Sequence, residues 1–168
     1  MSKEALQDGR CNNKQLSWLM IHELNTPSEL NEAYGLIRHL HPKLGKADFI
    51  SRLGLQRNDH GYVLLGLFQD LNPTDQKQLS SLAVLAGYRL ASSLSLGKYF
   101  YLGDLVTNPT YQGQGLAVQM LRYLEAIARD AGCRQIHLDA GVERFGAHRF
   151  YAKQGFNIVF HHFAKELG

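Results

Sequence analysis

Residues 107–117 read TNPTYQGQGLA, and this stretch joins an apolar run before it to an amphipathic run after it. Gly113 and Gly115 carry no side chain at the turn, and Ala117 carries only a methyl group, so an anion could approach the backbone here. Free N–H groups in a first helical turn bind phosphate, which makes this turn a candidate pyrophosphate site. The alternative is that the two glycines only shape a turn, since short Gly-x-Gly matches are common.

Two other phosphate motifs are missing from the chain. It has no Gly-x-x-x-x-Gly-Lys-[Ser/Thr] sequence, and Gly113-Gln114-Gly115 lacks the third glycine of a dinucleotide fingerprint. ATP and NAD are therefore poor candidates for the ligand of this turn.

The segments around the turn predict a mixed α/β fold. From Ala117 to Ala131 the apolar residues repeat at helical spacing, and Gly132 stands where such a helix would end. The other predicted helices cover 28–40, 47–56 and 147–154, and the predicted strands cover 16–24, 62–68, 82–90, 99–107, 135–140 and 156–167. A long polar loop is expected at 70–80. No internal repeat or linker interrupts this order, which favours one domain.

The composition is typical of a soluble globular domain. Of 168 residues, 45% are hydrophobic and 20% charged, and the net charge of +3 is spread along the chain without a basic run. Cys11 and Cys133 lie in unrelated contexts, as expected of free thiols, and no stretch resembles a signal peptide or a membrane span. We therefore expect a cytoplasmic protein with no nucleic-acid or membrane partner, in which residues 1–14 form a flexible leader and 15–168 form the domain.

Three segments together resemble the GNAT superfamily of N-acetyltransferases. Gln-x-x-Gly-x-Ala at 112–117 is similar to the loop that binds the acetyl-CoA pyrophosphate, and residues 101–106 resemble the family's central strand. Residues 147–156 resemble its Ala-x-x-Phe-Tyr-x-x-x-Gly-Phe segment. The resemblance covers residues 99–164, and the stretch 139–167 is also similar to aminoalkylphosphonate N-acetyltransferases.

This resemblance implies a particular fold and co-substrate site. The fold would be one α/β domain with four helices and a twisted mixed sheet of about six or seven strands. The sheet would be splayed between the strands at 99–107 and 135–140, with acetyl-CoA in the gap. In the family, backbone amides of the loop hold the pyrophosphate, here Gln112, Gly113, Gln114, Gly115, Leu116 and Ala117. The pantetheine arm would pair with the backbone at Leu105, Val106 and Thr107.

Direct acetyl transfer needs a base for the amine and an acid for the leaving thiolate. The resemblance places Tyr151 where the family's tyrosine reaches the CoA sulfur, so Tyr151 is the expected acid and also a co-substrate contact. Many relatives have a glutamate where this chain has Gly103, which leaves Asp104 as the nearest carboxylate. Asp104 could take the amine proton through water, bind the substrate ammonium, or only satisfy backbone donors. Asp139 is the reserve candidate for the base.

Histidines supply further candidates for catalysis. His148 lies one helical turn before Tyr151 and is the third predicted catalytic residue. His161 and His162 could be bases, hydrogen-bond donors to a phosphate or metal ligands, but their spacing is not that of a regular metal site, and we expect no metal. Arg149 and Lys153 could meet phosphates or could form a solvated helix surface.

The sequence leaves the acceptor open. A small primary amine is the first expectation, because nothing marks a long peptide groove. A protein lysine or N-terminus is the alternative within the enzyme class, and a non-catalytic acyl-CoA sensor is the alternative from another class. A homodimer is also expected from the resemblance.

Overall fold

The computed structural model describes residues 19–69 and 81–168. In chain order the elements are β1 (Leu19–Glu23), α1 (Pro27–Ile37), α2 (Lys46–His60), β2 (Val63–Gln69), β3 (Ser81–Ser93), β4 (Gly97–Thr107), the short 3-10 helix η2 (Pro109–Tyr111), α3 (Leu116–Asp130), β5 (Ile136–Leu138) and α4 (Phe145–Lys153). The predicted α/β class and its four α-helices are confirmed. The expected leader at 1–14 and the polar loop at 70–80 lie outside the described residues.

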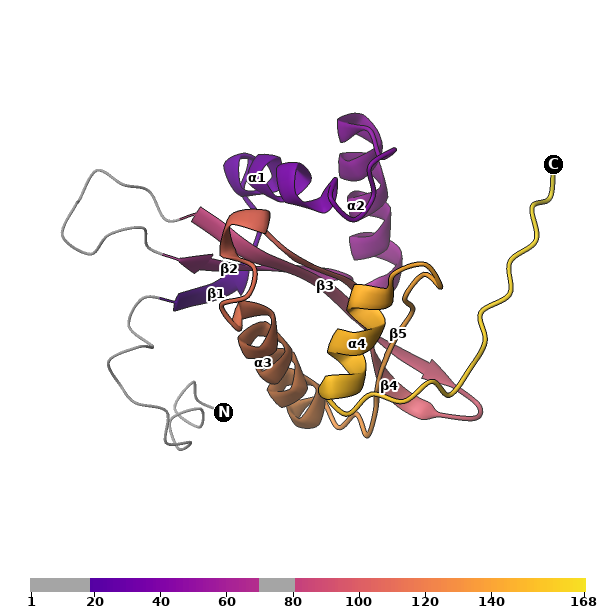
Figure 1. Cartoon of the computed structure of the whole chain (residues 1–168). Helices are drawn as coiled ribbons and strands as arrows, with labels where there is room; N and C mark the ends of the chain where they lie inside the picture. Colours follow the sequence, from indigo (N-terminus) through magenta and orange to yellow (C-terminus); the bar gives the residue numbers. More distant parts are fainter. Residues whose placement is uncertain (1–18, 70–80) are drawn as a thin grey trace.

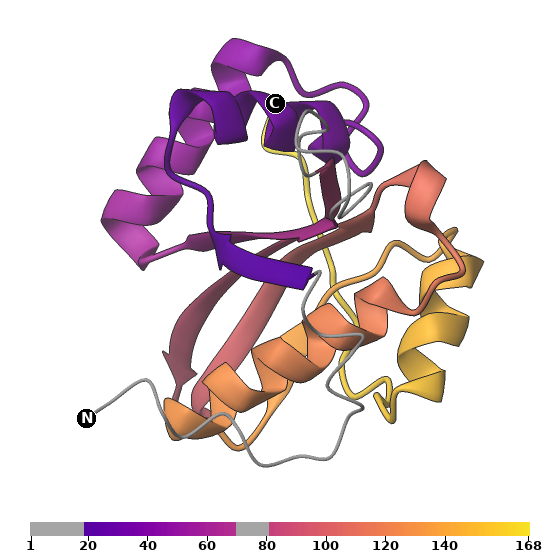
Figure 2. The same cartoon turned by 90° about the vertical axis from the view of Figure 1, so that its left-hand side faces the viewer.

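The sheet is mixed and follows the order of the chain, β1-β2-β3-β4-β5. Neighbouring strands are antiparallel except β4 and β5, which are parallel. Helices α1 and α2 cover one face of the sheet, and α3 and α4 cover the other (Figures 1 and 2). Each face therefore has its own apolar core, one beneath α1 and α2 and one beneath α3.

Helix α3 is held on the sheet by one apolar stripe. Leu116, Met120, Leu121, Leu124 and Ala128 recur at helical spacing and are buried against β3 and β4. Burying a leucine side chain of this kind stabilises the fold by roughly 1.5–3 kcal/mol. The stripe fixes the position of the N-terminus of α3, and with it the glycine turn at 113–115.

The sheet departs from expectation at its C-terminal side. The described residues form five strands, not six or seven, and the predicted strand at 156–167 is wrong because residues 156–168 have no regular secondary structure. A strand needs a hydrogen-bonded neighbour, and the adjacent edge strand β5 is only three residues long. The tail instead runs away from the body of the molecule (Figure 1), with Ile158 85% and Phe163 89% exposed.

The expected splay between β4 and β5 is present. The two strands pair only at Phe100–Ile136, Tyr101–His137 and Leu102–Leu138. At the next residue, Gly103, the register of β4 against β3 shifts, because Leu102 faces Tyr88 while Asp104 faces Gly87. Such a bulge bends the strand and re-aims the following side chains. From Gly103 to Thr107, β4 therefore has no described strand beside it on the β5 side.

Candidate active site

The glycine turn has the backbone geometry predicted for an anion site. Gly113 and Gly115 have φ values of +76° and +77°, in the left-handed region that disfavours other residues, although a Cβ at either position would meet nothing within 4 Å. Glycine is therefore required here for its backbone conformation and not for lack of space. Just upstream, Asn108 accepts a hydrogen bond from the Thr110 amide at 3.1 Å, which starts the turn η2.

The amides of this turn have no hydrogen-bond partner in the part of the chain that the structure describes. The first backbone bonds of α3 run from Val118 and Gln119 to the Gly115 carbonyl, and the N–H groups of 113–117 donate to no described residue. Residues 112–115 are exposed and Gly115 offers no capping side chain. Unpaired N–H groups at a helix N-terminus attract phosphate through both hydrogen bonding and the helix dipole. The turn can thus accept a pyrophosphate.

Asp104 lies just after the bulge of β4 and has two side-chain partners. The His41 Nε2 atom lies 2.8 Å from Asp104 Oδ1, and the Tyr62 hydroxyl donates a short hydrogen bond to Asp104 Oδ2. The Asp104 side chain is 20% exposed, whereas that of His41 is 50% exposed. The imidazole therefore connects a mostly covered carboxylate with solvent.

Two glycines make room for the Tyr62 ring. A Cβ on Gly87 would come within 1.8 Å of the Tyr62 hydroxyl oxygen, and one on Gly103 would lie 3.3 Å from the ring. Burial first, and then the Asp104 charge, raises the pKa of the Tyr62 phenol far above its usual value. Tyr62 therefore remains a hydrogen-bond donor to Asp104 at every physiological pH.

Tyr151 lies on α4, the helix that follows β5 in the chain. Its ring packs edge-on against Phe150 and Phe156, and its hydroxyl donates to no described residue. Burial raises the pKa of Tyr151 to about 12, and the Asp104 carboxylate adds to this while Arg144 opposes it. The Tyr151 phenol is consequently protonated at neutral pH and free to donate.

One guanidinium links the start of α4 to the loop after α1. Arg144, in the turn before α4, donates to the Leu40 carbonyl at 2.6 Å. Leu40 directly precedes His41, so this bond links α4 to the loop that supplies the partner of Asp104. The contact brings together residues 104 positions apart in the chain.

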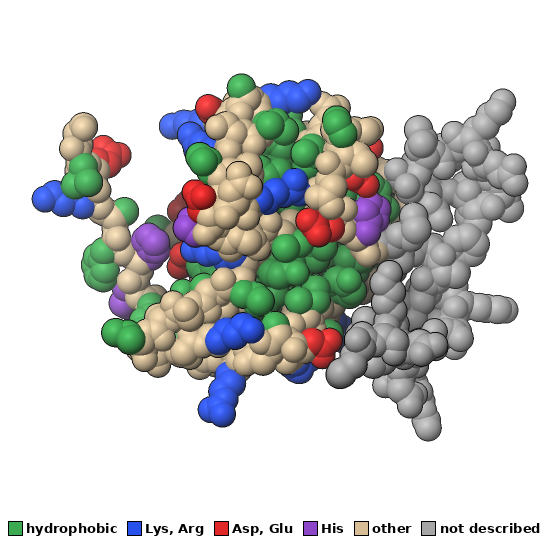
Figure 3. Space-filling view, turned by 180° about the vertical axis from the view of Figure 1, so that it is seen from behind, with side chains coloured by type: hydrophobic (Ala, Val, Ile, Leu, Met, Phe, Trp, Pro, Cys, Tyr) green, Lys and Arg blue, Asp and Glu red, His purple; other side chains and the backbone are tan. Residues whose placement is uncertain are grey.

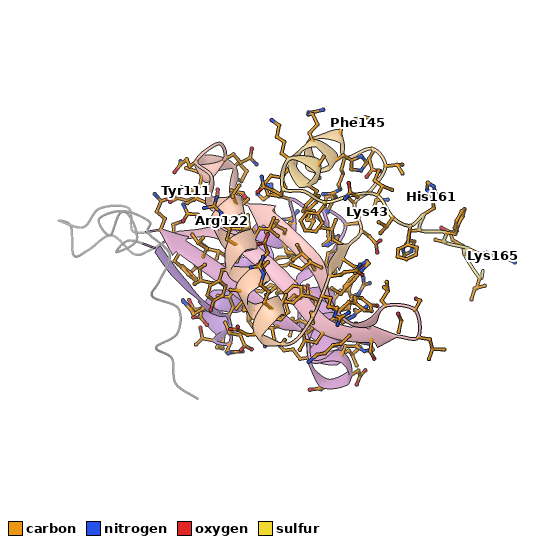
Figure 4. The ribbon with its side chains drawn as sticks, turned by 90° about the horizontal axis from the view of Figure 1, so that it is seen from below. Lys43, Tyr111, Arg122, Phe145, His161 and Lys165 are labelled. Carbon is orange, nitrogen blue, oxygen red and sulfur yellow. The ribbon has the colours of Figure 1, made fainter. Side chains whose placement is uncertain are left out.

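The other predicted residues have different surroundings. His148 Nε2 donates to the Gly141 carbonyl at 2.9 Å, which closes the loop before α4. Asp139 accepts a hydrogen bond from Tyr101 at 2.7 Å and lies 3.4 Å from His162 Nδ1. His161 contacts Phe163 in the tail. Figure 4 labels His161 and Lys165 on the projecting tail and Tyr111 at the opposite end of the sheet. Within 19–69 and 81–168, no three His, Cys, Asp or Glu side chains gather as metal ligands.

A cavity of about 770 Å³ adjoins Asp104 on the α1 and α2 side of the sheet. The helix wall includes the apolar side chains of Ile37, Phe49 and Leu53, and the sheet wall includes Arg89, Tyr101, Gly103 and Asp104. The cavity is large enough for a small-molecule substrate.

The sequence did not identify His41 or Tyr62 as site residues, because their contacts with Asp104 span 63 and 42 positions.

Comparisons with known proteins agree with this arrangement. The profile of the Acetyltransferase (GNAT) family matches residues 57–156. An uncharacterized N-acetyltransferase of Bacillus subtilis, YhdJ, is 29% identical over 151 residues, which cover 88% of this chain and all of YhdJ. The aminoalkylphosphonate N-acetyltransferase of Salmonella typhimurium is 36% identical over 64 residues, 38% of this chain and 42% of that protein.

Solved structures show the same fold. An acetyltransferase from Trypanosoma brucei has a TM-score of 0.67 at 24% identity and covers 89% of this chain and 99% of its own. The aminoglycoside N-acetyltransferase AAC(6')-Iy in complex with CoA has a TM-score of 0.70 at 16% identity. The match covers 89% of this chain and 95% of that chain. The solved structures show the shared fold, and the GNAT profile match together with the N-acetyltransferase relative defines the chain as an acyltransferase. The protein belongs to the GNAT family of acetyltransferases. Among the described residues, no helix has the length and apolar character to cross a membrane.

Proposed function

We propose that this protein transfers the acetyl group of acetyl-CoA directly to a small primary amine. The observation that carries the proposal is the edge of β4 from Gly103 to Thr107, which has no described strand on its β5 side. This edge begins at the bulge before Asp104 and continues along the chain through η2 to the glycine turn, whose amides have no described partner. The protein's family and its CoA-bound structural neighbour support acetyl-CoA as the co-substrate.

The residues that would hold acetyl-CoA are those predicted from the sequence. The amides of Gln112, Gly113, Gln114, Gly115, Leu116 and Ala117 would receive the pyrophosphate. The backbone of Leu105, Val106 and Thr107 would pair with the pantetheine arm as a neighbouring strand would. This pairing is supported by the lack of a described strand beside these residues on the β5 side.

Acetyl-CoA supplies a thioester whose carbonyl carbon the amine nitrogen attacks and whose C–S bond then breaks. The amine must first lose its ammonium proton, and Asp104 is the proposed acceptor. From Asp104 the proton passes to His41 across the 2.8 Å contact, and the half-exposed imidazole releases it to solvent. Tyr62 keeps the carboxylate oriented by donating to its other oxygen.

Tyr151 is the proposed acid for the departing thiolate. Its phenol is protonated at neutral pH and has no described protein acceptor, so its proton is available to the sulfur. The second proton lost by the attacking nitrogen, as the amide forms, would restore the Tyr151 phenol. His148 would act on the same step by holding the loop before α4 through its bond to the Gly141 carbonyl. We therefore assign His148 a positioning role beside the acid.

Relatives support a small-molecule acceptor. Partial matches include an aminoalkylphosphonate N-acetyltransferase and a probable glucosamine 6-phosphate N-acetyltransferase from rice, and the cavity beside Asp104 is of a size for such molecules. The test is release of free CoA thiol from acetyl-CoA in a screen of small amines and lysine peptides. Turnover with peptides alone would overturn the small-molecule assignment.

We also propose a homodimer and a cytoplasmic location. Apolar side chains of the tail at Ile158, Val159, Phe160 and Phe163 are exposed, and Figure 3 shows apolar groups on the projecting segment. Contiguous exposed apolar surface favours a protein partner. Light scattering after size-exclusion chromatography should give twice the mass of one chain, and a monomer mass would refute the dimer.

A further inference from the structure

We propose that the acceptor amine carries a second, anionic group, and that Arg89, Arg52 and Lys43 bind it in the cavity beside Asp104. This inference rests on the proposed acetyl transfer at the same site. It goes further by assigning both ends of the acceptor: an ammonium end at Asp104 and an anionic end at a cationic wall.

Among the side chains that line the cavity, positive charges outnumber negative charges. Three permanent cations line it, Lys43, Arg52 and Arg89, and Asp104 is its single carboxylate among the described residues. None of the three cations lies within 4.0 Å of a described carboxylate. Cations gathered in a concave surface without counter-charges attract an anionic ligand. A neutral or polycationic acceptor would leave them without partners.

Arg89 is the fixed member of the three. Its guanidinium lies 4.6 Å from the centre of the Tyr101 ring, and its Nη1 donates to Gln56 Oε1 at 3.4 Å. These two contacts orient the half-buried Arg89 side chain and leave the other N–H groups of its guanidinium available to a ligand. A guanidinium held in this way can bind a phosphoryl or carboxyl group through two parallel hydrogen bonds.

The sheet register sets the distance between the two ends. Arg89 faces Tyr101 across β3 and β4, and two residues back along β3, Gly87 faces Asp104. These pairs lie on one face of the sheet and are about 7 Å apart along the strand. A molecule with an ammonium and an acidic group a few bonds apart spans such a distance. Arg52 on α2 and Lys43 in the loop before it can meet the acidic group from the opposite wall.

The test compares primary amines that differ in their second group. With wild-type protein and acetyl-CoA, phosphoethanolamine and β-alanine should each exceed ethanolamine in kcat/KM by at least about tenfold, the effect of one charge-assisted hydrogen bond. In Arg89→Gln the ratio of phosphoethanolamine to ethanolamine should fall by a similar factor, mainly through KM. Arg122→Gln, at an exposed arginine on α3, removes the same charge outside the cavity and should leave the ratio unchanged.

A binding measurement separates this inference from the proposed function. Phosphoethanolamine should raise the unfolding temperature of the CoA-bound protein, whether or not acetyl transfer occurs, and Arg89→Gln should abolish the rise. If ethanolamine is acetylated as well as phosphoethanolamine, the anion site is refuted while the acetyl transfer stands. If phosphoethanolamine neither binds nor reacts, the inference is refuted. If no amine in the screen releases CoA, the proposed function fails instead.

Discussion

His41 and Asp104 are 63 positions apart in the chain, and their side chains meet at 2.8 Å beside the bulge of β4. His41 comes from the loop after α1, and Asp104 comes from the strand that would hold the pantetheine arm. The glutamate expected on this strand from the family resemblance is replaced by Gly103, whose missing side chain accommodates the Tyr62 ring. Asp104, with His41 and Tyr62 as its side-chain partners, is therefore the proposed general base.

Replacement of Asp104 tests the base directly. Asp104→Asn keeps the size of the side chain but removes the proton acceptor, so kcat should fall by about 10²-fold or more while acetyl-CoA still binds. The measurement is steady-state CoA release. Asp130→Asn, an exposed aspartate at the end of α3, is the matched control. A larger loss in Asp139→Asn than in Asp104→Asn would transfer the role to the reserve candidate.

Replacement of Tyr151 tests the acid. Tyr151→Phe keeps the ring contacts with Phe150 and Phe156 but removes the proton, so kcat should fall by about 10²-fold without loss of acetyl-CoA affinity. Tyr123→Phe on α3 is the control. Because the pKa of Tyr151 is raised to about 12, its protonated form persists, and Tyr151 should cause no alkaline loss of rate below about pH 10. Unchanged turnover in Tyr151→Phe would remove it from the mechanism.

Replacement of Gly115 tests the pyrophosphate site. Gly115→Asp puts negative charge beside the free amides of the turn and should weaken acetyl-CoA binding by at least about tenfold, measured by calorimetry. Any residue other than glycine is also strained at φ +77°. Gly132→Asp, at φ +76° beyond the other end of α3, imposes the same strain far from the turn. Equal affinity of the two variants would reject the site.

The N-terminus of α1 gives a prediction for stability against pH. Glu29 accepts hydrogen bonds from the backbone amides of Thr26 and Asn25, and these bonds, more than those from the Thr26 hydroxyl and His22, lower its pKa to about 2. The folded pKa is below the ordinary value of 4.5, so this stabilisation is full above pH 4.5 and is lost as pH falls toward 2.

Denaturant unfolding of Glu29→Gln measures this effect. The variant should be less stable than wild type by about 1 kcal/mol at pH 7, the usual contribution of a helix cap. The difference in unfolding free energy between wild type and variant should shrink between pH 4.5 and pH 2, because Glu29 becomes protonated in the wild type. A stability difference that stays constant over this pH range would show that the charge of Glu29 does not contribute to stability.

Much of the fold follows from local patterns in the sequence. The period of the apolar residues after Ala117 predicts α3, and Gly113 and Gly115 predict a turn whose backbone is indeed left-handed. The predicted strand at 156–167, by contrast, does not form. Its apolar residues have strand propensity, but propensity does not supply a neighbouring strand, and β5 is too short to pair with it.

The site was only partly predictable because its parts come from distant segments. Asp104 and Tyr151 lie in stretches that resemble the family, whereas His41 only follows the predicted helix at 28–40 and Tyr62 only begins the predicted strand at 62–68. Their positions depend on α1 and α2 packing on the sheet and on the spaces left by Gly87 and Gly103. Neither feature has a local sequence pattern.

Thermal unfolding of the wild-type protein with acetyl-CoA, CoA or NAD tests the proposed co-substrate site most directly. A ligand that binds only the folded state stabilises it by about 2.7 kcal/mol at 100 times its Kd. The Tm of the protein should rise by several degrees with acetyl-CoA and with CoA, and should not change with NAD. No shift with acetyl-CoA at millimolar concentration would contradict the assignment of the gap between β4 and β5 as its binding site.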